Sequence, residues 1–115
     1  MNESPMREPT FLILTCLVEG PQHGYAILAE VRRISGGRVD LRAGTLYAVL
    51  DRLRAEGLAE VDREELVQSR LRRYYRLTAL GAQRLAQETA RMRDNVEAAT
   101  ARLRRAGLSL NGGIA

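Results

Sequence analysis

Arginines gathered near the middle of the chain carry the clearest chemical signal in these 115 residues. Arg70, Arg72, Arg73 and Arg76 fall within seven residues. A guanidinium group binds phosphate as a bidentate fork, and such a cluster is the charge pattern expected of a nucleic-acid-binding surface. The whole chain has a formal net charge of +4, and all 18 of its basic residues are arginine. GC-rich codon usage would also favour arginine, and a solvated strand carries similar charges, so the cluster alone leaves both interpretations open.

A second polar group lies on one face of a helix predicted over residues 43–58. Apolar residues at i, i+3, i+4 and i+7 give this helix a buried stripe. The stripe consists of Leu46, Val49, Leu50 and Leu53. Thr45, Tyr47 and Arg52 lie off the stripe, and Gly57 is expected to end the helix. A hydroxyl and a phenol in the first turn, followed by arginines, suit a helix that enters the major groove of DNA.

Residues that carry enzyme or metal chemistry are scarce. The single cysteine, Cys16, lies in the apolar run FLILTCLV, where a buried inert thiol is expected. The single histidine, His23, has no second metal-ligating partner nearby in sequence, so a structural role at the start of a helix is expected. Glycine-rich phosphate loops and metal-spacing motifs are absent. We therefore expect no enzyme, no cofactor and no metal site.

The elements before these residues are predicted to be helices. Residues 1–8 are polar and expected to be disordered, and they lack the apolar core of a signal peptide. A first, largely buried helix follows from Pro9, and a second is predicted over residues 24–34, ended by Gly36-Gly37. With 45% apolar residues and no apolar run long enough to span a membrane, one cytoplasmic domain without membrane contact is expected.

The arginine cluster itself lies on a predicted antiparallel hairpin. Residues 58–64 and 70–77 alternate between apolar and polar side chains, and residues 65–69 are expected to form a polar, mobile tip. In the second strand, one face carries Leu71, Arg73, Tyr75 and Leu77. Tyr75 is expected to face inward, while the orientation of Tyr74 stays open. Three helices followed by a two-stranded hairpin form a winged helix-turn-helix, a mainly α (α+β) fold, over residues 9–77.

A long last helix is predicted over residues 78–106, with Thr78 as its N-cap and a flexible tail over residues 107–115. Apolar and small residues along it follow alternating spacings of four and three, the seam of a coiled coil. The seam residues expected to dimerise are Leu85, Met92, Val96, Ala99 and Leu103. A helix of about 28 residues is about 42 Å long. So small a domain cannot cover all of it, so its seam is expected to meet a second copy.

Three segments of the chain are similar to a known family. These are GPQHGYAI, AGTLYAVLDRLRAEGL and SRLRRYYRLTALG, at residues 20–27, 43–58 and 69–81. Together they resemble the PadR-like transcriptional regulators, of the short class with a single C-terminal dimerisation helix. The resemblance covers about residues 9–106. It implies a homodimeric repressor on a palindromic operator in double-stranded DNA, with the third helix in the major groove and the wing along the backbone or minor groove.

The resemblance and the polar face of the predicted third helix together give a set of expected DNA-binding residues, of which Arg42 and Arg52 come from the residues themselves and not from the family pattern. These are Tyr25, Arg42, Thr45, Tyr47, Arg52, Arg70, Arg72 and Arg73. Arg42 and Ala43 stand where the family commonly has Ser-Pro before GTLY, and Ala48 stands where it commonly has proline. The lost serine N-cap should cost about 1 kcal/mol of helix stability, and Arg42 offers a phosphate contact in exchange.

Two further expectations concern partners. Some members of the family respond to small hydrophobic or aromatic effectors, so release from DNA by such a ligand is implied here too. The chain has no tryptophan and one phenylalanine with which to stack a ligand of this kind. The alternative function is a protein–protein adaptor that uses the helical seam and does not bind DNA.

Overall fold

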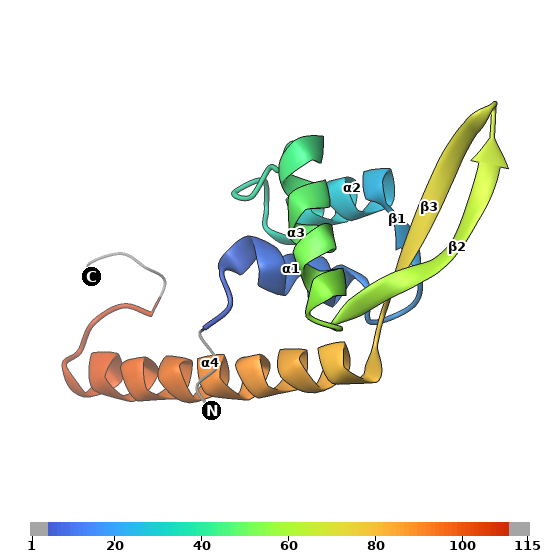
Figure 1. Cartoon of the computed structure of the whole chain (residues 1–115). Helices are drawn as coiled ribbons and strands as arrows, with labels where there is room; N and C mark the ends of the chain where they lie inside the picture. Colours follow the sequence, from blue (N-terminus) through green and yellow to red (C-terminus); the bar gives the residue numbers. More distant parts are fainter. Residues whose placement is uncertain (1–4, 111–115) are drawn as a thin grey trace. The chain divides into compact units, whose positions relative to one another are not determined.

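The computed structural model describes residues 5–110, which form four helices and three strands (Figure 1). In chain order these are α1 (Glu8–Cys16), β1 (Gln22–His23), α2 (Gly24–Ile34), α3 (Ala43–Ala55), β2 (Ala59–Val67), β3 (Arg70–Leu77) and α4 (Ala79–Arg105). Helices α1 to α3 pack together, and the β2–β3 hairpin projects from them as a wing (Figure 1). The predicted α+β winged helix-turn-helix fold is confirmed.

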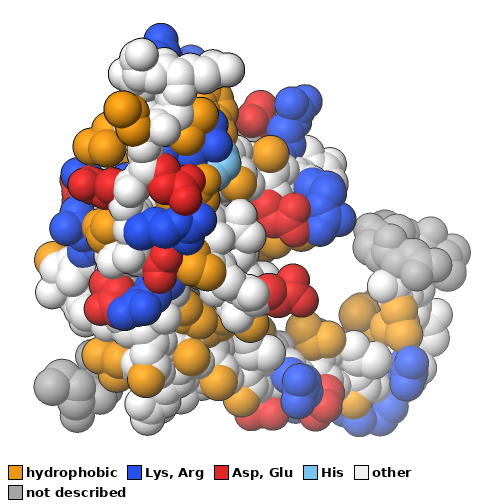
Figure 2. Space-filling view, turned by 90° about the vertical axis from the view of Figure 1, so that its right-hand side faces the viewer, with side chains coloured by type: hydrophobic (Ala, Val, Ile, Leu, Met, Phe, Trp, Pro, Cys, Tyr) orange, Lys and Arg blue, Asp and Glu red, His pale blue; other side chains and the backbone are white. Residues whose placement is uncertain are grey.

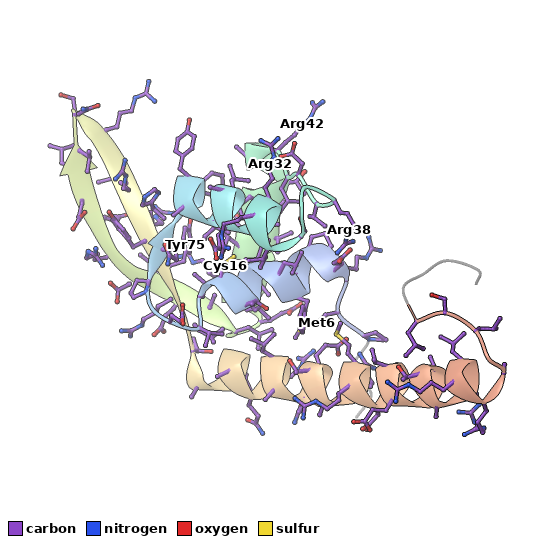
Figure 3. All side chains as sticks on the ribbon, turned by 180° about the vertical axis from the view of Figure 1, so that it is seen from behind. Met6, Cys16, Arg32, Arg38, Arg42 and Tyr75 are labelled. Carbon is purple, nitrogen blue, oxygen red and sulfur yellow. The ribbon has the colours of Figure 1, made fainter. Side chains whose placement is uncertain are left out.

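The first three helices form where the apolar pattern predicts them. Helix α2 has the predicted bounds, and α3 buries its whole predicted stripe. Helix α1 starts at Glu8, one residue earlier than expected, with a proline in its first turn. Cys16 is buried between helices α1 and α2, and burial raises the pKa of its thiol to about 11 (Figure 3). The burial predicted for this thiol is therefore confirmed.

The sheet has three strands rather than two, in the order β1-β3-β2. The short strand β1 was not predicted; it pairs antiparallel with β3, placing Gln22 opposite Tyr75 and His23 opposite Tyr74. Strand β2 continues to Val67, so the predicted five-residue tip was wrong. Only two residues form the turn, and both have positive φ, Gln68 at 50° and Ser69 at 65°. Two such residues give a turn whose twist matches that of the flanking strands.

Side chains of the wing are buried next to the helices and exposed farther along the hairpin. Tyr75 points from β3 toward the helices and is buried, as predicted (Figure 3). Leu71 lies on the same face of β3, but its side chain is 64% exposed. Pairing is irregular between Val61 and Arg63 of β2, and the strand beyond this bulge has no fully buried residue. The alternation of side chains places Leu71 on the same face as Tyr75, but Leu71 lies beyond the end of the hydrophobic core.

The start of α4 is fixed tightly to the end of α3. The Thr78 hydroxyl accepts a hydrogen bond from the Gly81 amide at 2.9 Å and donates one to the Gly57 carbonyl at 2.6 Å. Thr78 therefore caps α4, as predicted. Gly81 lies directly against the Leu58 carbonyl group and the Leu77 side chain, so that a Cβ on Gly81 would overlap both. The first turn of α4 is thus packed against the residue before β2 and the last residue of β3.

The chain divides into two compact units, Met1–Leu85 and Ala86–Ala115. The first unit includes the start of α4 and so extends beyond the boundary predicted after Leu77. Leu85 belongs to its hydrophobic core and is only 8% exposed, so the structure places this predicted seam residue inside the first unit.

Farther along α4, the side chains of Met92 and Val96 are exposed and Ala99 is too, while Leu103 is half-buried. Gly107, at a φ of 73°, follows the helix end, as expected. Disorder was predicted for residues 1–8 and a flexible tail for residues 107–115, and of these residues 1–4 and 111–115 lie outside the described residues. Among the described ones, Met6 packs against the hydrophobic core, and Glu8 begins α1 and lies 2.8 Å from Arg38. No helix in residues 5–110 is both long enough and apolar enough to cross a membrane.

Candidate nucleic-acid interface

A hollow of about 460 Å³ lies between β3 of the wing and the start of α2, and we call it the wing hollow. Its lining residues are His23, Gly24, Tyr25, Tyr47, Val67, Gln68, Arg70, Leu71, Arg72 and Arg73. Strand β1 covers β3 only at residues 74–75, so the same edge of β3 is open along residues 70–73. The hollow brings together five of the eight DNA-binding residues predicted from sequence.

Two tyrosines form the helical side of the wing hollow. Tyr25, in the first turn of α2, is 77% exposed, which excludes a role in packing the core. Tyr47, in α3, is 43% exposed and lies off the buried stripe, as predicted. Its phenol ring packs over Gly24 at the start of α2. Both side chains offer hydroxyl groups on the side of the unit where the wing arginines lie.

Most charges on the wing are paired across its two strands. Arg73 lies 2.9 Å from Glu64, and Arg76 lies 2.6 Å from Glu60. Acidic and basic side chains therefore interleave over the hairpin surface (Figure 2). Arg70 and Arg72 differ, because neither forms an ion pair with any residue in 5–110. These two guanidinium groups, both in the wing hollow, are thus the ones that form no ion pair within residues 5–110, although Arg72 faces Glu65 across the two strands.

Three predicted DNA-binding residues lie outside the wing hollow. Arg42 precedes the first residue of α3 and makes no side-chain cap, which is the missing cap expected from sequence (Figure 3). Thr45 is exposed in the first turn of the same helix. Arg52 donates a hydrogen bond to the Thr10 hydroxyl of α1 at 2.8 Å. Of the three, only Arg52 is already engaged with another element of the fold.

His23 joins the wing to α2. As the N-cap of α2 it accepts a hydrogen bond from the Ala26 amide through Nδ1, at 3.4 Å, which confirms the predicted structural role. Its ring meets the Tyr74 ring edge to face, with centroids 5.3 Å apart, and the Arg63 guanidinium covers Tyr74. Burial lowers the pKa of His23 below 6.5, and the charge of Arg72 adds to this, against an opposite effect from Glu65.

We expect the stability of the fold to depend on His23 under mildly acidic conditions. Because its pKa is lower in the folded state, the unfolded state binds more protons, and the free energy of unfolding falls as pH drops through about 6.5. Protonation also removes the Nδ1 acceptor from the Ala26 amide. His23→Asn keeps a capping side chain without titrating. Between pH 7.5 and 5.5, chemical unfolding should show a smaller decrease in the free energy of unfolding for His23→Asn than for the natural chain. Equal decreases would contradict the role assigned to His23.

Gly24 was not predicted from sequence to be a residue of this surface. The string HGYAI contains it, but nothing in the string shows that a tyrosine from another helix lies over it. Strand β1 was missed as well, because two residues are too few to show alternation. Within residues 5–110, no three His, Cys, Asp or Glu side chains form a group that could hold a metal ion.

Comparison with known proteins identifies the family. A curated relative, an uncharacterised 37.1 kDa protein in transposon Tn4556 of Streptomyces fradiae, is 38% identical over 81 residues, which are 70% of this chain and 22% of the relative. A PadR family transcription regulator from Clostridium difficile R20291 superimposes with a TM-score of 0.71 at 25% identity, covering 84% of this chain and 99% of that one.

Bacillus subtilis PadR, solved in complex with operator DNA, superimposes with a TM-score of 0.63 at 26% identity. That match covers 70% of this chain and 46% of the Bacillus protein, so this chain spans less than half of it. The model of the transcriptional regulator PadR-like family matches residues 13–87, which include α2, α3 and the whole wing. The chain belongs to the PadR-like family of transcriptional regulators.

Proposed function

We propose that this chain is a sequence-specific DNA-binding repressor that acts as a homodimer on a palindromic operator in double-stranded DNA. The observation that supports this most is the wing hollow, where two exposed tyrosines lie on one side of the unit with Arg70 and Arg72. A relative with the same fold has been solved with operator DNA. Such a function places the protein in the cytoplasm, with the DNA that it regulates.

The proposed contacts divide by chemistry. Thr45 and Tyr47 read bases from the start of α3, where a methyl group meets thymine and hydroxyls meet base edges or phosphates. Tyr25 and Arg42 contact phosphates on either side of the groove. The wing arginines Arg70, Arg72 and Arg73 bind backbone phosphates, with Arg73 held in place by Glu64. Arg52 contributes to the positive charge near the DNA while it stays bonded to Thr10.

The proposed dimer forms along α4 beyond Leu85. Met92 and Val96 expose large apolar side chains four residues apart on this helix, and Ala99 and Leu103 continue the line at spacings of three and four. Pairing two copies along this line would hold two α3 helices at half-sites about 34–36 Å apart, one turn of duplex DNA. A small hydrophobic or aromatic effector that binds beside these apolar side chains would release the DNA, and a thermal-shift screen of aromatic compounds tests for it.

We expect Arg72→Ala to weaken binding to operator and random DNA alike. Arg72 lacks an ion-pair partner in residues 5–110, so its guanidinium is available to displace counterions from a phosphate. Removing one phosphate interaction should reduce the slope of log K against log salt by about 0.9. The matched control is Arg76→Ala on the same strand, since Arg76 lies outside the wing hollow and is paired with Glu60.

Fluorescence anisotropy with labelled operator and random duplexes, across a salt series, measures both quantities. An unchanged salt slope for Arg72→Ala, or an equal change for Arg76→Ala, would contradict the proposed role of Arg72. The operator itself comes from selection of genomic fragments by the purified protein. The adaptor alternative would be supported if a stable dimer retained no genomic fragment at low salt.

A further inference from the structure

We propose that Gly24 is a positioning residue of the DNA interface, because its missing side chain forms the slot that holds the Tyr47 phenol. This inference rests on the proposed DNA-binding function, and it concerns a residue that makes no DNA contact of its own. It assigns to α2 a specific effect on α3: the first residue of one helix sets the direction of an exposed side chain on the next.

The packing between the two residues is closer than any side chain on Gly24 would allow. A Cβ built on Gly24 would overlap the Tyr47 hydroxyl and would lie 2.9 Å from the Cζ atom of the ring. Cβ atoms in proteins do not approach other heavy atoms so closely. Alanine at this position would therefore require the phenol ring to leave its place.

Backbone conformation does not explain this glycine. Five other glycines in residues 5–110 have positive φ, from Gly20 to Gly107, but Gly24 does not; it is the first residue of α2. In helical conformation alanine is favoured over glycine. A glycine that is buried, helical and without positive φ is therefore best explained by what packs on it, and the three heavy atoms nearest to a Cβ at Gly24 all belong to Tyr47.

The consequence for DNA binding follows from the exposure of Tyr47. Its ring is 43% exposed in the wing hollow, so one face packs on α2 while the remainder is available to DNA. A side chain already held in its binding conformation loses less freedom on binding than one that must be ordered. Gly24 thus fixes the Tyr47 hydroxyl relative to Tyr25 and the wing arginines.

A double-mutant cycle tests the slot. The variants are Gly24→Ala, Tyr47→Ala and the double substitution, each measured for thermal unfolding and for affinity to the selected operator. We expect Gly24→Ala alone to weaken operator binding about fivefold or more, the effect of disturbing one direct contact. When Tyr47 is already alanine, adding Gly24→Ala should cause no further loss of affinity. The added substitution should then raise the melting temperature, because no ring occupies the slot and alanine is favoured over glycine in a helix.

Gly44→Ala is the matched control for thermal unfolding. Gly44 is also in the first turn of a helix without positive φ, but nothing lies within 4 Å of its built Cβ. It should raise the melting temperature equally with or without Tyr47. The NMR signals of the Tyr47 ring, assigned by their loss in Tyr47→Ala, should shift in Gly24→Ala and stay unchanged in Gly44→Ala.

The outcomes separate this inference from the proposed function. Unshifted Tyr47 signals in Gly24→Ala, together with additive melting temperatures in the cycle, would overturn the slot. Shifted signals with unchanged operator affinity would overturn the positioning role. If the natural chain binds no DNA, the proposed function fails and the positioning role fails with it, while the slot is still decided by the NMR signals and the melting temperatures.

Discussion

Val96→Glu should convert the proposed dimer to a monomer and reduce operator affinity about a hundredfold or more. Val96 is 62% exposed on α4, on the line of apolar residues expected to meet a second copy. In a symmetric dimer the substitution would place two carboxylates near the axis, where like charges and reduced apolar packing oppose pairing. Two linked DNA-binding units bind about 10² to 10⁴ times more tightly than one unit alone, and a monomer loses this gain in affinity.

Sedimentation equilibrium gives the association state, and anisotropy with the selected operator gives the affinity. The matched control is Ala98→Glu, which adds the same charge to an exposed position on a different face of α4. It should remain a dimer and bind as before. A dimeric Val96→Glu protein would show that the seam beyond Leu85 is not the interface.

Gly81→Ala should strongly destabilise the first unit, residues 5–85 of the described chain. Its Cβ would overlap the backbone carbonyl of Leu58, and it would lie 2.8 Å from a methyl group of Leu77. The Leu58 carbonyl cannot move away cheaply, because its residue is 2% exposed and the carbonyl accepts a hydrogen bond from the Thr78 amide at 3.2 Å. Overpacking of this kind costs about 2–3 kcal/mol.

Urea unfolding followed by circular dichroism measures this loss, which corresponds to about 10–20 °C in melting temperature for a domain of this size. Gly44→Ala is again the control, because it adds the same methyl group to another helix where no atom is near. It should leave stability unchanged or raise it by up to about 1 kcal/mol. A Gly81→Ala protein within about 0.5 kcal/mol of the natural chain would contradict the packing seen at the start of α4.

The helices could be predicted because their signals are local. The spacing of Leu46, Val49, Leu50 and Leu53 fixes the buried face of α3 without reference to any other element, and α2 has the predicted bounds for the same reason. The wing was less predictable at its end. Its turn is made by Gln68 and Ser69 in a conformation that usually takes glycine or asparagine, so no turn signal was present.

The candidate site was predictable only in its exposed residues. The wing arginines could be recognised by their charge, and Tyr47 by its position off the apolar stripe of α3. The interactions that place them join distant positions: Tyr47 reaches back to Gly24, and Arg52 reaches 42 residues back to Thr10. Leu85 fits the heptad spacing as well as Val96 does, but the core of the first unit buries it. Spacing identifies an apolar residue without showing which apolar surface it will join.

The bulge between Val61 and Arg63 divides the wing into two parts that differ in burial. Before it, the hairpin shares the core through Tyr75 and Ala59; beyond it, the pair Leu66 and Leu71 is exposed and almost no apolar surface is buried. Opening the outer part therefore costs far less free energy than global unfolding, and its amide protons should exchange with solvent first. A wing whose inner part is fixed to the core while its outer part can move could adapt to DNA duplexes whose groove width varies from one sequence to the next.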